Sequence, residues 1–152
     1  LKAYAYILRL GREGLIRVSE AAVLSANYMR KRLADAIEVP YDRVCMHEFV
    51  ASAARLAAEK NVRALDIAKA LLDRGYHAPT IYFPLIVKEA LMFEPTETES
   101  KDTLDTFVAD LLDILALAET DPEAIRACPT TLPVGRLDET YAARAMEITD
   151  DL

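Results

Sequence analysis

The sequence predicts a two-layer α+β domain, in which a short, mostly antiparallel sheet carries helices on one face. Three observations lead to this fold class. The chain has 152 residues, of which 53% are apolar, so it can bury one compact core. Segments with helical periodicity are long, whereas the strand-like runs are short. Prolines close several of these runs, and proline is confined to the ends and edges of strands.

The N-terminal part of the chain is predicted to form two helices. Residues 1–10 place their apolar side chains on one helical face. Gly11 and Gly14 interrupt this pattern, since a glycine costs up to about 1 kcal/mol in a helix interior. A longer amphipathic helix follows over residues 13–36.

Residues 44–52 alternate weakly between apolar and polar side chains, which predicts the first strand. A period of two would place Cys45, His47 and Phe49 on one face. His47 and Glu48 look like half of a zinc motif, but that motif needs a second histidine four residues along a helix, and none follows. A histidine satisfied within a buried strand is the simpler explanation.

The next segments lead to a helix with a clear end. Residues 53–62 are alanine-rich and polar, and they form either a loop or a short turn of helix. Residues 65–74 are predicted to be helical, with Asp66 favoured near the positive N-terminus. Gly75 stands where a left-handed C-terminal cap is needed.

Prolines punctuate the middle of the chain. Residues 80–83 and 91–94 are predicted to be short strands, joined by a bulging connection over residues 84–90. Polar side chains over residues 77–80 and 94–97 then lie at strand ends, where functional groups are commonly carried. The two groups can share one rim.

The last elements are predicted from a cap and a period. Thr96 and Glu99 have the spacing of a capping box for the next helix. That helix follows from apolar side chains that recur every 3.6 residues over residues 104–118. The Thr-Asp-Pro at 120–122 begins a new short element, and residues 128–152 are expected to form an extended, charged tail.

Five side chains are candidates for a site, each with a structural alternative. His77 can act as a general acid or base or stack on a planar group, although a plain turn histidine fits its surroundings equally. Glu94, Glu97 and Glu99 can supply paired carboxylates for acid–base chemistry. Glu97 and Glu99 also lie next to a helix N-terminus, where acids are favoured for structural reasons. Arg55 can clamp a carboxylate, or it can simply be solvated.

Charge and motifs exclude several functions. A net charge of −7 leaves no basic surface for nucleic acid. An apolar run of about 18 residues, enough to span a membrane, is absent. So are a phosphate-binding glycine loop, a serine-hydrolase elbow and a metal-ligand spacing. Cys45 and Cys128 stand far apart, which indicates reduced thiols and a cytoplasmic location.

The chain begins at Leu1, inside a helical pattern and without a methionine, so we expect a fragment of a longer protein. Exposed apolar side chains are then expected at Tyr4, Ile7 and Leu8, where a larger domain would pack.

Five blocks of sequence carry a further signal: ANYMRKRL (26–33), CMHEFV (45–50), LDIAKALLDRGYHAPTIYFP (65–84), ALMFEPTETESKDTLDTF (90–107) and RLDETYAAR (136–144). Together they resemble the C-terminal region of the glycine dehydrogenase (decarboxylating) P-protein of the glycine cleavage system. The longer connection after Pro84 and the short tail look like the second subunit of the two-subunit form.

This resemblance implies a fold and a division of the chain. The family has the aspartate-aminotransferase-like fold (fold type I), with a large cofactor domain followed by a small C-terminal α+β domain. Residues 1–36 would be the end of the large domain and a long connecting helix. Residues 37–127 would be the small domain, and residues 128–152 the tail.

The resemblance also implies a reaction. The parent enzyme would use pyridoxal phosphate to release CO2 from glycine, and would pass the aminomethyl group to the lipoyl arm of the H-protein. Its partners would be glycine, the lipoylated H-protein and the other P-protein subunit or half. The cofactor lysine of the family sits in a Ser/His-Lys segment upstream of the region that this chain resembles, so the resemblance gives that role to none of its lysines: Lys2, Lys31, Lys60, Lys69, Lys88 and Lys101.

Carried over by position, a set of side chains would form the cleft rim of the parent: His47, His77, Thr80, Glu94, Thr96, Glu97 and Arg55. We expect the fragment to close over the active site and to be inactive alone. Two other functions stay open, namely a non-catalytic interaction domain on the same fold and a fold type I enzyme that acts on another amino acid.

Overall fold

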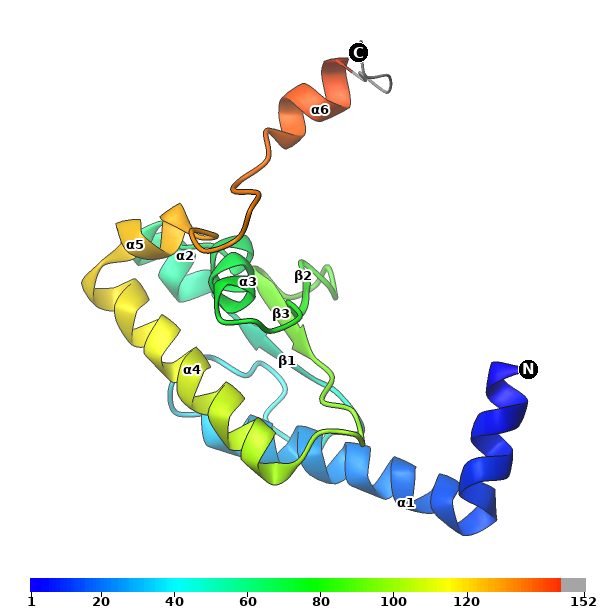
Figure 1. Cartoon of the computed structure of the whole chain (residues 1–152). Coiled ribbons are helices and arrows are strands. Elements are labelled where there is room, and N and C mark those ends of the chain that lie inside the picture. The colour runs from blue at the N-terminus through cyan, green and yellow to red at the C-terminus, as the bar shows by residue number, and fades with distance from the viewer. Residues whose placement is uncertain (146–152) are drawn as a thin grey trace, which may run out of the picture.

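The computed structural model describes residues 1–145, in which six helices and three strands surround one core (Figure 1). None of these helices is long and apolar enough to cross a membrane. The elements in chain order are α1 (Lys2–Leu33), β1 (Phe49–Ser52), α2 (Ala54–Lys60), α3 (Ala64–Asp73), β2 (Thr80–Ile81), β3 (Ala90–Phe93), α4 (Lys101–Thr120), α5 (Pro122–Ala127) and α6 (Glu139–Ala145).

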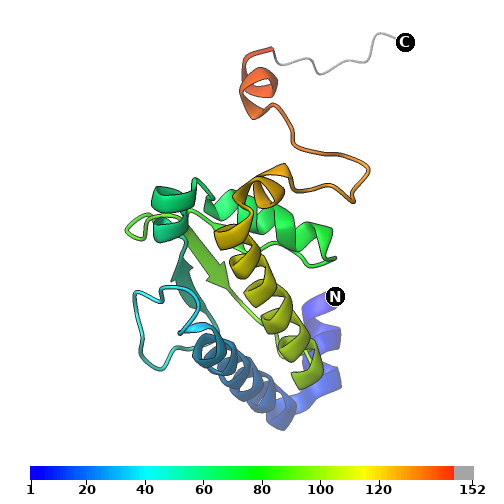
Figure 2. The ribbon, with the colours of Figure 1, turned by 90° about the vertical axis from the view of Figure 1, so that its left-hand side faces the viewer.

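The three strands form one antiparallel sheet in the order β1-β3-β2. β3 is central and pairs along its whole length with β1, from Phe49 opposite Phe93 to Ser52 opposite Ala90. Helices α3 and α4 cover one face of this sheet, which lies behind α4 in Figure 2. The predicted α+β class, with a short antiparallel sheet and helices on one face, is confirmed.

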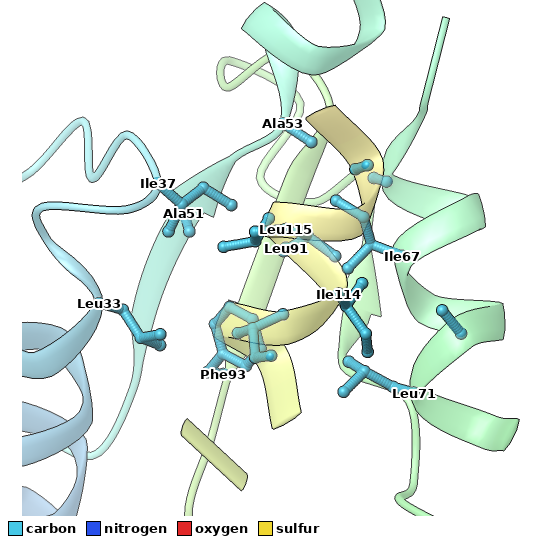
Figure 3. Close-up of a cluster of buried hydrophobic side chains, with 14 of the residues drawn as sticks. Leu33, Ile37, Ala51, Ala53, Ile67, Leu71, Leu91, Phe93, Ile114 and Leu115 are labelled. Atoms are coloured by element: carbon cyan, nitrogen blue, oxygen red, sulfur yellow. The ribbon is translucent and has the colours of Figure 1, made fainter. Parts of the chain in front are cut away.

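The core lies between the sheet and these helices (Figure 3). Period two sends Leu91 and Phe93 of β3 to the helical side, where both are buried. The stripe predicted on α4 meets them, because Leu111 and Leu115 are buried at helical spacing. Leu33, at the end of α1, closes the core.

The break predicted near the N-terminus occurs at Gly11. Gly11 has φ 62° and ψ −174°, a conformation that side chains disfavour, and the helix axis turns there (Figure 1). The predicted interruption at Gly14 is wrong, because Gly14 lies within the second helical segment. Gly75 ends α3 with φ 83°, as predicted for a left-handed cap.

The first strand is shorter than predicted, since only Phe49–Ser52 of the expected 44–52 is a strand. The Asn27 side chain takes the place of a neighbouring strand: its Nδ2 donates to the Cys45 carbonyl at 2.7 Å and its Oδ1 accepts from the Cys45 N–H at 3.0 Å. His47 therefore lies in an exposed loop, and the explanation of a satisfied histidine in a buried strand is wrong.

Other helix and strand boundaries also differ from those predicted. Residues 53–62 contain the helix α2, one of the two alternatives left open. β2 ends at Ile81, two residues before the predicted end. Ser100 caps α4 in place of the Thr96–Glu99 box, because its hydroxyl accepts the Thr103 N–H at 3.1 Å. The short element after residue 120 is α5, and the tail that was expected to be extended contains α6.

Candidate functional site

A cavity of about 440 Å³ opens at the end of the sheet where β2 begins and β3 ends. Small-molecule sites occupy roughly 300–1,000 Å³, so the cavity has the size of a binding site. Its wall comes from α1, from the segments beside β2 and β3, and from α4: Met29, Tyr76, His77, Ala78, Pro79, Thr80, Met92, Phe93, Glu94, Pro95, Thr96, Glu99, Thr103, Leu104 and Phe107.

Strand pairing explains why four of the predicted rim residues meet here. β2 and β3 are antiparallel, with Thr80 opposite Met92, so the start of β2 lies beside the end of β3. His77 and Thr80 come from the first strand end, and Glu94 and Thr96 from the second. These four side chains line one cavity although Thr80 and Glu94, the nearest members of the two pairs, are 14 positions apart in sequence.

The cavity has an apolar floor. Phe107 of α4 meets the Tyr76 ring edge to face, with ring centroids 4.9 Å apart and an interplanar angle of 83°. Phe93 lies 5.9 Å from Phe107 on its other side, also edge to face. Met29 and Leu104, both buried, complete the apolar part of the wall. The floor suits an apolar group and the rim suits a polar one.

Tyr76 is held by a charged network behind the floor. Its hydroxyl donates to Asp110 Oδ2 at 2.5 Å, and Arg74 Nη1 donates to the other carboxylate oxygen at 2.6 Å. Burial and the hydrogen bond to Asp110 raise the pKa of Tyr76 to about 12. The same hydrogen bond, with that of Arg74, lowers the pKa of Asp110 below its ordinary value. The phenol therefore stays neutral and fixes the ring against the cavity.

Glu97 lies beside the cavity and does not line it. It accepts a hydrogen bond from the Tyr6 hydroxyl at 2.8 Å, and this bond is the largest cause of a raised pKa at Tyr6. The helical segment before the Gly11 kink is thereby tied to the turn that follows β3. The hydroxyls of Thr96 and Thr98 share a further hydrogen bond at 2.7 Å within this turn.

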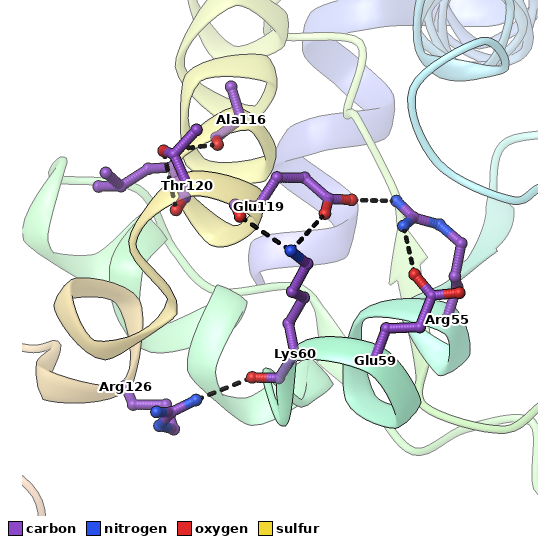
Figure 4. A network of polar contacts seen from close by, with 8 residues as sticks. Arg55, Glu59, Lys60, Ala116, Glu119, Thr120 and Arg126 are labelled. Atoms are coloured by element: carbon purple, nitrogen blue, oxygen red, sulfur yellow. Dashed lines mark hydrogen bonds and ion pairs between the residues drawn. The ribbon is translucent and has the colours of Figure 1, made fainter.

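Arg55 lies away from the cavity, in the network of Figure 4. Its guanidinium pairs with Glu59 at 3.0 Å and with Glu119 of α4, and Glu119 also lies 3.6 Å from Lys60 Nζ. These hydrogen bonds raise the pKa of Arg55, that from Glu119 the most. Two carboxylates already engage this arginine, so it joins α2 to the end of α4.

His47 is the other predicted rim residue that lies elsewhere. Its imidazole is exposed in the loop before β1, with Nε2 3.8 Å from Glu48. Within residues 1–145, no group of three or more His, Cys, Asp or Glu side chains could hold a metal ion.

The cavity of this chain does not fit pyridoxal phosphate on its own. That cofactor needs a lysine for its imine, and none of the described residues that line the cavity is a lysine or an arginine. Lys60 and Lys101 are paired with Glu119 and Asp105. The cavity wall alone therefore does not supply the lysine that this cofactor requires.

Several wall residues were not predicted from the sequence. Tyr76 follows the cap glycine directly, where no periodic pattern assigns it a position. Thr103 and Phe107 belong to the strongest predicted helix, but periodicity does not say which end of that helix meets the strand ends. The apolar stripe of α1 did predict that Met29 is buried, although not that it borders a cavity.

The fold and the site together define a small α+β domain with an open cavity at its strand ends, as in the small C-terminal domain of a fold type I enzyme. The chain belongs to the family described as "Glycine dehydrogenase, C-terminal domain", whose model matches residues 18–126. The resemblance stated from the sequence is confirmed.

Curated relatives agree with this family. The chain is 58% identical over 144 residues to a protein of Desulforamulus reducens named "Probable glycine dehydrogenase (decarboxylating) subunit 2", which covers 95% of this chain. Proteins of the same name from Chlorobaculum tepidum and Thermotoga maritima are each 54% identical, over 97% and 95% of the chain. The chain spans about 30% of the length of each of these relatives.

Proposed function

We propose that this chain is the C-terminal domain of subunit 2 of a two-subunit glycine dehydrogenase (decarboxylating). The observation that carries the proposal is the match to the C-terminal domain family over residues 18–126, with relatives of that name at 58% identity and below. The structure supports it with a small α+β domain whose strand ends open into a cavity with a polar rim.

The activity belongs to the complete enzyme. There, pyridoxal phosphate held outside this chain would accept the electrons released when glycine loses CO2. The aminomethyl group would pass to the lipoyl arm of the H-protein. This domain would close over the cleft, exclude water and place polar groups near the substrate or the arm.

The cavity rim suits that task. His77, Thr80, Glu94 and Thr96 offer a ring nitrogen, two hydroxyls and a carboxylate at one opening. The floor below them is aromatic and aliphatic, so a ligand with an apolar stem and a polar end would fit both parts. We propose these four side chains as the functional rim, whereas Glu97, His47 and Arg55 keep the positions described above.

The chain's two histidines provide a matched test. The full-length subunit, its companion subunit, pyridoxal phosphate and lipoylated H-protein should exchange labelled CO2 with the carboxyl group of glycine. We expect His77→Gln to lower this exchange by about tenfold, or roughly 1.4 kcal/mol of transition-state stabilisation. His47→Gln should leave it unchanged, because both histidines are exposed but only His77 lines the cavity.

Absence of exchange by the folded, cofactor-loaded wild-type complex would refute the activity. Equal losses in the two histidine variants would refute the placement of the rim. A spectral titration with glycine and other amino acids separates this function from a fold type I enzyme with another substrate, and binding without exchange would favour an interaction domain. We also propose a cytoplasmic location, supported by the free thiols of Cys45 and Cys128.

A further inference from the structure

The chain continues along the domain after its last buried helix. Residues 128–136, which follow α5, lie beside α3 in both views of the molecule (Figures 1 and 2). Cys128 packs against the core and Pro129 is buried, whereas residues 130–136 are exposed. Exposed chain ends outside helices and strands are usually held by few contacts, but this segment is attached at two points. We call residues 128–136 the strap.

The first attachment is at the end of α3. The carboxylate of Asp73, the last residue of this helix, accepts the Thr130 N–H at 2.6 Å and the Thr131 N–H at 2.9 Å. The Thr131 hydroxyl donates to Asp73 Oδ1 at 2.8 Å and lies 3.3 Å from the Asp73 carbonyl oxygen. The last carbonyl groups of a helix have no partner within it. The strap therefore satisfies the C-terminal end of α3 from outside the helix.

The second attachment is at the beginning of the same helix. Arg136 Nη2 lies 2.6 Å from Oδ1 of Asp66, in the first turn of α3, and Arg136 Nε donates to the Cys128 carbonyl at 2.7 Å. Asp66 is 5% exposed, and its Oδ2 accepts the Arg63 N–H at 2.7 Å. A buried carboxylate is tolerated where it is paired and hydrogen-bonded. Arg136 therefore supplies the charge that the capping carboxylate of α3 requires.

The two attachments lie at opposite ends of one helix. Asp66 and Asp73 are seven residues apart, about 10.5 Å along a helix that rises 1.5 Å per residue. The Arg136 hydrogen bond to the Cys128 carbonyl closes the strap on itself, so both attachments belong to one loop. The match to the family model ends at residue 126, before the strap begins.

The end of α3 leads directly into the cavity wall. Tyr76 and His77, which line the cavity, follow this helix after the cap at Gly75. The Tyr76 N–H donates to the Leu71 carbonyl at 3.1 Å, which ties the wall to the last turn of α3. Asp110 of α4 holds the Tyr76 hydroxyl. The position of His77 is therefore set by α4 and by the last turn of α3, and the strap holds the second of these.

We propose that the strap is part of the small domain and works as a positioning device for the cavity wall. It holds both ends of α3, and through the last turn of this helix it limits the movement of Tyr76 and His77. Releasing the strap should leave the fold intact, because Ile67 and Leu71 of α3 stay buried in the core, but it should make the wall mobile. The end of the small domain, predicted at residue 127, then moves to residue 136. The inference goes beyond the proposed function, since it holds for any ligand of the cavity.

Hydrogen exchange of the full-length subunit tests this device. Arg136→Gln removes the charge that pairs with Asp66 and leaves the rest of the strap unchanged. We expect the amides of Gly75 and Tyr76 to exchange about fivefold faster in this variant, because both are hydrogen-bonded to the last turn of α3. Arg136→Lys keeps the charge and should restore most of the wild-type rate.

A second variant tests the other attachment, and two controls match the chemical changes. Thr131→Val keeps the shape of the side chain, removes the hydroxyl that donates to Asp73, and should also speed exchange at Tyr76. Thr106→Val removes a hydroxyl on the exposed side of α4, and Arg55→Gln removes an ion-paired charge on α2. Neither of these side chains bonds to α3 or to the strap, so neither control should change exchange at Tyr76.

Three results would overturn the proposal. Unchanged exchange at Tyr76 in both strap variants would show that the cavity wall is held without the strap. Equal acceleration at Tyr76 and at Ile37, whose N–H bonds to Leu33 at the end of α1, would show general destabilisation instead of local release. An equal effect of Arg55→Gln and Arg136→Gln at Tyr76 would show that the site of the lost charge is irrelevant. These measurements need no substrate, so a failure of the strap and a failure of the proposed activity are distinguished.

Discussion

Replacing Tyr76 by phenylalanine removes one hydroxyl and leaves the aromatic floor of the cavity in place. The lost bond joins the phenol to Asp110 at 2.5 Å. Hydrogen bonds to charged groups contribute about 1.5–3 kcal/mol. Arg74 still holds Asp110 at 2.6 Å in the variant, so the carboxylate is not left unpaired. We therefore expect a loss at the low end of that range, about 1.5–2 kcal/mol in the free energy of unfolding.

The dependence of this loss on pH identifies its cause. The pKa of Asp110 is lowered in the folded protein, so its stabilisation is complete above the unfolded value, near pH 4, and disappears as the pH falls through the folded value. The pKa of Tyr76 is raised to about 12, so the contribution of the phenol is complete below the unfolded value, near pH 10, and is lost as the pH rises toward 12. The difference in unfolding free energy between wild type and Tyr76→Phe should be largest between about pH 4 and pH 10, and it should shrink at lower and at higher pH.

Urea unfolding at a series of pH values measures this difference. Tyr4→Phe is the matched control, since Tyr4 is 65% exposed, and its effect should stay within about 0.5 kcal/mol. A Tyr76→Phe difference that is the same at about pH 3 and pH 7 would refute the charged hydrogen bond as its source. A variant as stable as wild type at neutral pH would refute the role of the network itself.

Two further substitutions test other parts of the framework. Asp73→Asn should lower the free energy of unfolding by about 1–3 kcal/mol and speed proteolysis after Thr131, because Asp73 accepts the Thr130 and Thr131 N–H groups at 2.6 and 2.9 Å. Burial acts to raise the pKa of Asp73, but these hydrogen bonds lower it below its ordinary value. The difference in unfolding free energy between wild type and variant, measured in urea, should therefore shrink as the pH falls below about 4. Leu91→Ala should lower the free energy of unfolding by about 2–5 kcal/mol, since Leu91 is buried in the central strand, whereas Leu85→Ala in the exposed β2–β3 turn should change the 152-residue chain by less than about 0.5 kcal/mol; equal effects of the two would contradict the placement of the core.

The sequence pattern alone was sufficient to predict the elements whose apolar side chains recur at a regular spacing. Helix α4 is predicted well because its apolar residues recur every 3.6 positions and the same residues are buried. The kink at Gly11 and the cap at Gly75 follow from backbone freedom that only glycine offers without cost. The short strands were predicted because prolines and polar residues stand at their ends.

Long-range contacts decided the rest. The strand predicted to begin at residue 44 fails because the Asn27 side chain, far away in the sequence, occupies the backbone groups of Cys45. Nothing in the alternation of residues 44–48 could show this. Likewise both His47 and His77 were predicted at the rim, and only the pairing of β2 with β3 places one of them, His77, in a cavity. Arg55 has its role set by Glu119, on another helix.

The cavity rim and the turn over residues 83–86 lie at opposite ends of the short hairpin formed by β2 and β3. β2 has two residues, and both pair with β3, so a displacement of the turn cannot be absorbed within the strand. Leu91 is fully buried on β3, which makes the pairing of Ile81 with it the fixed point of the hairpin. Thr80, which pairs with Met92 at the rim, stands next to that pair. The exposed turn and the rim side chains therefore belong to one short hairpin, so Leu85→Glu in the complete enzyme should be assayed for glycine–CO2 exchange as well as for stability.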